Sequence, residues 1–139
     1  MDYRLGEREA DVLLGRVKRI GAAAADLVAF SDQDPELASL SGIEVPSLEA
    51  RTLLSGGLVG AVSSRCAESL RSGRPCSISS AELDAVSRLE AVVATGATRV
   101  AQRIAALEDS EKKALQDHIG GVVSIGTGIV ALVRTLGVF

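Results

Sequence analysis

The sequence predicts an all-α fold, an antiparallel four-helix bundle with long helices and one short extra helical turn between helices 1 and 2. Apolar residues recur three and four positions apart through most of the 139 residues, which is the period of an α-helix. Proline and stretches rich in Gly and Ser divide this pattern into four long segments. A chain of this length forms one core and is too short for two. We therefore expect a single domain over residues 1–139.

The first helix is expected over residues 6–30, because its apolar residues form a single stripe. The stripe consists of Ala10, Leu13, Val17, Ile20, Ala24 and Leu27. The segment after this helix concentrates Ser, Asp, Gly and two of the three prolines. Within it, Asp34 before Pro35 predicts the short extra helical turn.

The second helix is expected over residues 46–72, since Pro46 suits a first helical turn and Gly73 followed by Pro75 is a stop signal. The third is expected over residues 80–108. Ser79 and Glu82 have the spacing of a capping box at its start. The apolar stripe of this third helix consists of Val86, Leu89, Val93, Val100, Ile104 and Leu107.

The fourth helix is expected over residues 110–137, with Asp109 or Ser110 as its cap. Its last part is apolar, and Arg134 is the one charged residue in the final twenty. A β-hairpin around residues 126–128 is the alternative. Helix is favoured because the apolar residues match the helical period and a lone hairpin would have no other predicted strand to pair with. These residues are Val122, Ile125, Ile129, Leu132 and Leu136.

Small residues repeat at intervals of four in the second and fourth predicted helices. Glycine inside a helix costs about 0.5 to 1 kcal/mol relative to alanine, so a close approach of another helix is expected to offset it. Both helices carry bulky residues on the opposite side and are predicted to be apolar nearly all round, which requires covering beyond a single bundle. The two sets are Gly56, Gly60 and Ser64, and Gly120, Ser124 and Gly128.

These features favour a non-catalytic helical assembly or interaction protein that self-associates through the two sets of small residues, as a subunit of a homo-oligomer, filament or shell. One alternative is a small membrane-associated protein anchored by residues 119–139. Another is a regulatory bundle that binds an anionic metabolite near the start of the third helix, where cations and hydroxyls gather. That candidate site consists of Arg71, Arg74, Ser77, Ser79 and Ser80.

Several chemistries are not expected. His118 is the only histidine, no Glu-x-x-His pair occurs, and no phosphate-binding glycine loop is present. We therefore predict no catalytic residues, no metal site and no cofactor, and a pairing of Cys76 with His118 as nucleophile and base has nothing in the sequence to bring it together. Aromatic residues make up 2% of the chain and the net charge is −3, so nucleic-acid binding is not expected.

Cys66 and Cys76 are expected to be buried free thiols, with a disulfide between them as the alternative in a thermophile or an oxidising compartment. Arg outnumbers Lys twelve to three, a composition that fits a thermophile. Acidic residues precede the first apolar run, so a secretory signal is not expected. The predicted location is cytoplasmic, with membrane association as the alternative.

Overall fold

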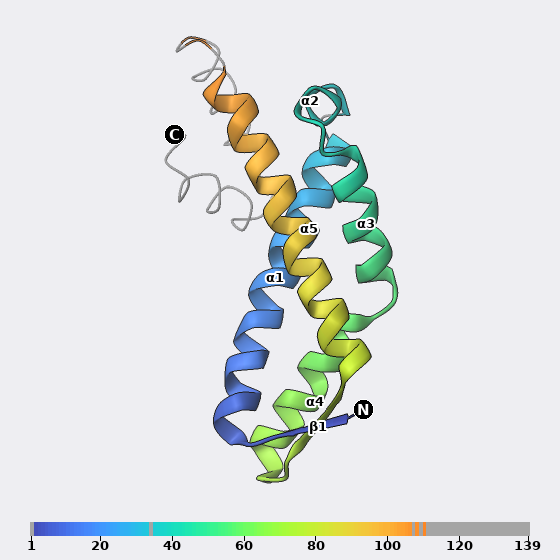
Figure 1. The fold of residues 1–139 in the computed structure, drawn as a ribbon, viewed down its shortest axis with the longest axis vertical. Helices are drawn as coiled ribbons and strands as arrows, with labels where there is room; N and C mark the ends of the chain where they lie inside the picture. The colour runs from blue at the N-terminus through green and yellow to red at the C-terminus, as the bar shows by residue number, and fades with distance from the viewer. Residues whose placement is uncertain (1, 34, 107, 109, 111–139) are drawn as a thin grey trace.

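The computed structural model describes residues 2–33, 35–106, 108 and 110. Over these residues the chain is mostly helical, which confirms the all-α prediction (Figure 1). A short pair of strands is the only sheet in the described part of the chain. In chain order the elements are β1 (Asp2–Leu5), α1 (Glu7–Gln33), α2 (Pro35–Ser41), α3 (Glu44–Ser55), α4 (Leu58–Ser72), β2 (Cys76–Ser79) and α5 (Ser80–Ala105).

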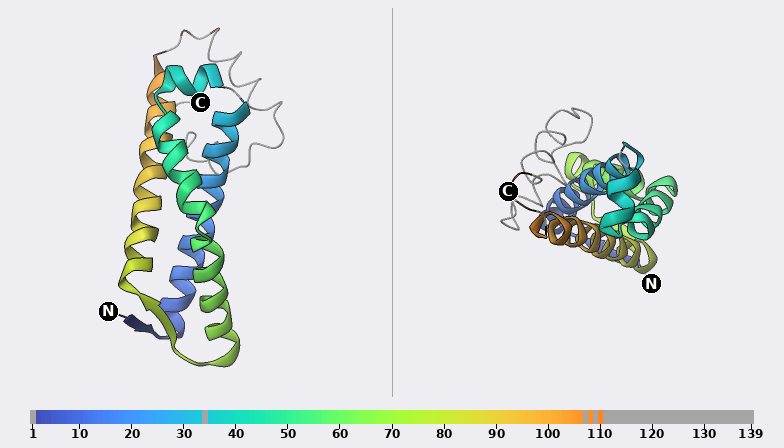
Figure 2. Two further views of the ribbon diagram at one scale, coloured as in Figure 1. Left: turned by 90° about the vertical axis from the view of Figure 1, so that its right-hand side faces the viewer. Right: turned by 90° about the horizontal axis from the view of Figure 1, so that it is seen from above.

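The two longest helices, α1 and α5, lie along the length of the molecule (Figure 2). Helices α3 and α4 follow one another end to end beside them (Figure 2). Helix α1 contacts α3, α4 and α5. The short helix α2 lies at one end of this bundle, and β1 and β2 lie at the other (Figure 1). The fourth helix predicted over residues 110–137 falls outside the described residues, so the four-helix arrangement stays a prediction.

The predicted first helix and the extra turn after it are both found. All six residues of the predicted α1 stripe are buried. Helix α1 extends to Gln33, and α2 begins at Pro35 as the Asp-Pro signal predicts. Helix α2 ends at Ser41, and the following residue, Gly42, has a left-handed φ of +71°. The amide of Ile43 donates to the carbonyl of Ala38 at 3.1 Å, the hydrogen bond that closes a Schellman motif.

The single helix predicted over residues 46–72 is wrong, because two helices occupy this region. Helix α3 begins earlier, at Glu44, and ends at Ser55, and α4 begins at Leu58. The break falls at two consecutive glycines, and Gly57 has a left-handed φ of +74°, which glycine adopts without steric cost. Its amide donates to the carbonyl of Leu54 at 3.1 Å, so the turn supplies a hydrogen bond to a carbonyl in the last turn of α3.

The antiparallel pairing of β1 with β2 was not predicted. Its register sets Tyr3 opposite Ile78 and Leu5 opposite Cys76. Both Ile78 and Cys76 are buried, so β2 contributes two side chains to the core at the base of the bundle. The pairing joins the start of the chain to the segment between α4 and α5.

Helix α5 begins as predicted. The Glu82 amide donates to the Ser79 hydroxyl oxygen at 3.1 Å, and the Ser79 amide donates to the Glu82 carboxylate at 3.0 Å. These reciprocal bonds confirm the capping box. Four members of the predicted stripe are buried, while the side chains of the last two lie outside the described part. The four are Val86, Leu89, Val93 and Val100.

Two glycines mark the closest helix contacts. A Cβ atom added at Gly21 in α1 would lie 2.8 Å from Val59 Cγ1 in α4. One added at Gly96 in α5 would lie 2.8 Å from Leu27 Cδ2 in α1. Since real Cβ contacts are longer than this, glycine at these two positions lets the helices approach each other. Neither residue was among those predicted to permit close packing.

Candidate functional site

The candidate self-association residues on α4 lie on its solvent-facing side, which we call the α4 outer face (Gly60, Ser64, Glu68 and Arg71). All four residues are exposed, while Val62 on the opposite side is buried. A Cβ atom added at Gly60 would meet no atom of the described residues within 4 Å. The backbone of α4 is therefore open to solvent along this part of the helix.

The prediction that this region is apolar nearly all round is wrong for α4. On the outer face, Arg71 and Glu68 form an ion pair at 2.7 Å, and both side chains are more than 60% exposed. Helix α4 is therefore amphipathic, with small residues near its start and charges near its end. Gly56 lies in the break before α4 and is exposed. The matching set predicted in the fourth helix, Gly120, Ser124 and Gly128, lies outside the described residues.

The predicted anion site has a different arrangement from the one that the sequence suggested. Arg71 pairs with Glu68, and Arg74 and Ser77 are exposed. Ser79 and Ser80 are half-buried at the start of α5, as expected, but a carboxylate of the chain itself already lies there. The Ser79 hydroxyl donates to that carboxylate, Glu82 Oε1, at 3.0 Å.

The guanidinium that faces this carboxylate belongs to Arg65 in α4, a residue that sequence reasoning missed. Arg65 Nη1 donates to Glu82 Oε1 at 2.8 Å and to the carbonyl of Ser77 at 3.2 Å. Arg65 is separated from Glu82 by 17 positions and belongs to another helix, so no local pattern identifies the pair. The Glu82 carboxylate thus already lies at the positive end of α5, and anion binding there stays a prediction.

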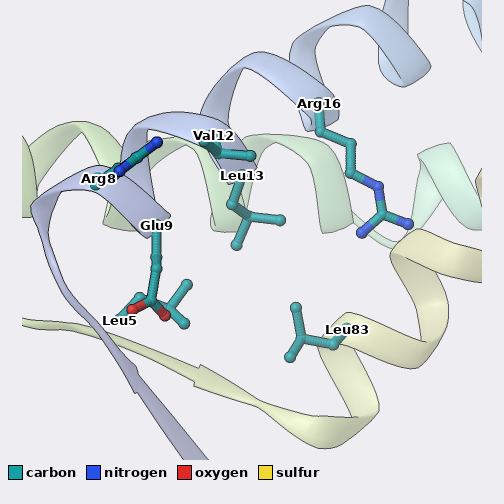
Figure 3. A pocket seen from close by; sticks show the side chains of 7 residues that line it. All are labelled: Leu5, Arg8, Glu9, Val12, Leu13, Arg16 and Leu83. Carbon is teal, nitrogen blue, oxygen red and sulfur yellow. The ribbon is translucent and has the colours of Figure 1, made fainter.

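A hydrophobic groove of about 350 Å³ lies at the base of the bundle, between β1, the start of α1 and the start of α5 (Figure 3). Leu5, Leu13 and Leu83 approach it from these three elements, and Val12, which is 64% exposed, lies at its edge. Arg8, Glu9 and Arg16 complete the lining. An apolar surface bordered by charges is suited to contact with another apolar segment, and it contains no arrangement of nucleophile and base.

Arg16 closes one side of this groove by linking α1 to α5. Its Nε and Nη2 atoms donate to the two carboxylate oxygens of Glu90 at 3.0 and 3.1 Å. This bidentate hydrogen bonding with Arg16 lowers the pKa of the Glu90 carboxyl below its ordinary value. Since the guanidinium is already paired, its role at the groove is to hold the two helices together.

A second exposed apolar patch lies where α3 faces α5. Val45 and Leu48 are 63% and 62% exposed, and a groove of about 290 Å³ lies beside Val45. Its lining includes Val45, Arg88 and Arg99. Arg99 Nη1 donates to the Gly42 carbonyl at 2.6 Å, so this side of the groove is fixed to the turn before α3.

Cys66 and Cys76 are buried free thiols, which confirms their predicted burial. Burial and the neighbouring Cys76 raise the pKa of the Cys66 thiol from 9.0 to about 11, so the Cys66 thiol is protonated at neutral pH. The described residues contain no group of three or more potential metal ligands, and His118 lies outside them. None of the described helices combines the length and the apolar character required to cross a bilayer.

Comparisons of the chain with protein-family models, with curated protein sequences and with solved structures give no match.

Proposed function

We propose that this protein is a non-catalytic helical assembly protein whose copies associate through the α4 outer face and through the small residues of segment 120–128. The observation that carries the proposal is the exposed glycine within α4. Gly60 is the third residue of α4, and glycine within a helix is unfavourable by about 0.5 to 1 kcal/mol relative to alanine. No described residue approaches it closely enough to require the absence of a side chain.

Three other glycines of the described part contrast with Gly60, whereas Gly15 in α1 resembles it in having no close neighbour. Gly21 and Gly96 lie against side chains of a neighbouring helix, and Gly57 has a left-handed backbone. At each of these three positions, a contact or a backbone angle within the chain itself explains why the residue is glycine. A second copy packed against the α4 outer face would supply the corresponding reason at Gly60, because glycine and serine allow two helix backbones to approach closely.

Exposed apolar side chains elsewhere are in keeping with an assembling protein. Val12, Leu40, Val45 and Leu48 are each at least 57% exposed. Single exposed apolar residues are common on monomers, so these four residues indicate association less strongly than Gly60 does. Together they provide apolar area that association with other copies would cover.

A fourth helix over residues 110–137, antiparallel to α5, is part of the proposal. At 1.5 Å per residue the 26 residues of α5 span about 39 Å, and 28 further helical residues would span about 42 Å. Such a helix can return along the whole bundle, and its apolar final turns would reach the groove between Leu5, Leu13 and Leu83. The small residues of segment 120–128 would then occupy the middle of the bundle's length.

The test is the molar mass of the full-length protein in solution. Wild type should form a discrete species larger than one chain by light scattering after size-exclusion chromatography. Gly60→Leu should shift the protein to smaller species while far-UV circular dichroism shows unchanged helicity, because the added side chain separates two packed backbones. Gly128→Leu should act in the same direction.

A matched control places the same side chain on another exposed helix face. Thr98 is exposed on α5, and Thr98→Leu should leave the molar mass unchanged. A wild-type protein that is monomeric at tens of micromolar would refute the proposal. Large particles that form without detergent and dissolve to monomers in it would instead favour the membrane-anchored alternative.

A further inference from the structure

Two cysteine side chains meet at the base of the bundle, where α4 is followed by β2. Cys66 lies in α4 and Cys76 is the first residue of β2, and their sulfur atoms are 3.8 Å apart. Both side chains are buried, with exposures of 0% and 2%. An S–S bond is about 2.05 Å long, so the two sulfur atoms have to approach by less than about 2 Å to be bonded.

We propose that Cys66 and Cys76 are the site of an intramolecular disulfide, formed by thiol–disulfide exchange with a low-molecular-weight disulfide such as oxidised glutathione. The thiolate of one cysteine attacks a sulfur of the oxidant, which forms a mixed disulfide and releases one small thiol. The second cysteine thiolate attacks the mixed disulfide and releases the other. The cysteine pair loses two protons and two electrons, and the oxidant is reduced to two small thiols.

The surroundings of the two cysteines favour a disulfide within one chain. The two residues are ten positions apart, and the segment between them contains the left-handed Gly73 and the exposed Pro75 at the end of α4. That exposed turn can adjust while the helix and the strand keep their positions. The described residues offer no third ligand beside the two sulfur atoms, which argues against a metal site as the purpose of the pair.

The bond would fasten the base of the fold. It would join α4 to β2 covalently, and β2 is already paired with β1, where Leu5 lies opposite Cys76. Leu5 also lines the groove at this end of the bundle. Oxidation would therefore restrict the separation of α4 from the strand pair and stiffen one wall of that groove.

The test oxidises the thiols during refolding, because burial slows attack on either thiol in the native state. The product then reports whether the disulfide is stable in the folded protein. The reduced full-length protein is unfolded in denaturant and refolded in a mixture of reduced and oxidised glutathione. Remaining thiols are then blocked with an alkylating agent, and the intact mass is measured. We expect a main product that is two hydrogen atoms lighter than the reduced chain and carries neither alkyl groups nor glutathione.

The second measurement is thermal stability. The oxidised protein should melt about 5 to 10 °C higher than the reduced one, because a short loop is closed in the unfolded state. Addition of dithiothreitol should reverse this gain, and Cys66→Ala and Cys76→Ala should each abolish it. Recovery of two alkylated thiols, of glutathione adducts or of cross-linked dimers as the main product would overturn the proposal. A bridged chain that melts lower than the reduced one would also overturn it, because the native packing would then oppose the bond.

Discussion

Alanine at Gly96 should destabilise the protein although alanine is the better helix former. The added Cβ would lie 2.8 and 2.9 Å from the two terminal carbons of Leu27, which has no exposed surface. The propensity gain is about 1 kcal/mol, and overpacking in a filled core costs about 1 to 3 kcal/mol. We therefore expect Gly96→Ala to lower the free energy of unfolding by about 1 kcal/mol.

Gly15→Ala is the matched control, because it makes the same chemical change in the interior of α1, where the new Cβ would meet only the end of the Arg19 side chain, at 3.5 Å. It should raise the free energy of unfolding by about 0.5 to 1 kcal/mol. The gap between the two variants is about 2 kcal/mol, or roughly 6 to 10 °C in Tm for a chain of this size. Urea denaturation followed by far-UV circular dichroism measures it.

A double-mutant cycle identifies the atoms responsible. Leu27→Ala removes the side chain that the new methyl group meets, so it should cost less in the Gly96→Ala background than in wild type, by about 1 kcal/mol. The reasoning is refuted if Gly96→Ala proves as stable as Gly15→Ala. It is also refuted if the cycle shows no coupling, because close packing against Leu27 would then not be why residue 96 is glycine.

Two further predictions concern the start of α5 and the buried thiol. Glu82→Ala should lower the free energy of unfolding by about 1 to 2 kcal/mol, since it removes the carboxylate that accepts from the Ser79 amide and from Arg65, whereas Glu82→Gln keeps a capping residue and should lose only the pairing with Arg65, under about 1 kcal/mol. Chemical denaturation compares the two, and equal losses would contradict the capping explanation. Because the pKa of the Cys66 thiol is raised from 9.0 to about 11, an unfolded chain loses this proton at lower pH than the folded one, so the stability present below pH 9 should decline between pH 9 and 11. Cys66→Ala should reduce the slope of that decline in thermal melts of the reduced protein, and an unchanged slope would count against the assignment.

The positions of the helices were largely predictable because their signals are local. The stripe from Ala10 to Leu27 has the helical period, and every member of it is buried in α1. The Asp-Pro signal located α2, and Ser79 with Glu82 located the start of α5, since caps depend on residues three positions apart. The break at Gly56 and Gly57 was missed because a helical apolar pattern continues on both sides of it and the turn occupies only two residues.

The candidate site was less predictable. Gly60 and Ser64 were correctly placed opposite the buried Val62, because position around a helix follows from the period. The prediction that they contact another helix has no support within the described part of the chain. The two glycines that do permit close packing, Gly21 and Gly96, could not be distinguished from the others, since the neighbouring side chain belongs to a different helix.

The sequence by itself determined most of the helical positions in the described part of the chain, which side of α1 and α5 is buried and how α5 is capped, because those properties depend on residues within one or two turns of each other. Only the tertiary structure decided the pairing of Leu5 with Cys76, the contact of Cys66 with Cys76, the Arg65 to Glu82 hydrogen bond and the glycine contacts of α1. Each of those brings together residues from different elements, and Leu5 and Cys76 are 71 positions apart. Their distance and direction are set by how whole helices pack against each other, and a short window of sequence contains no information about that packing.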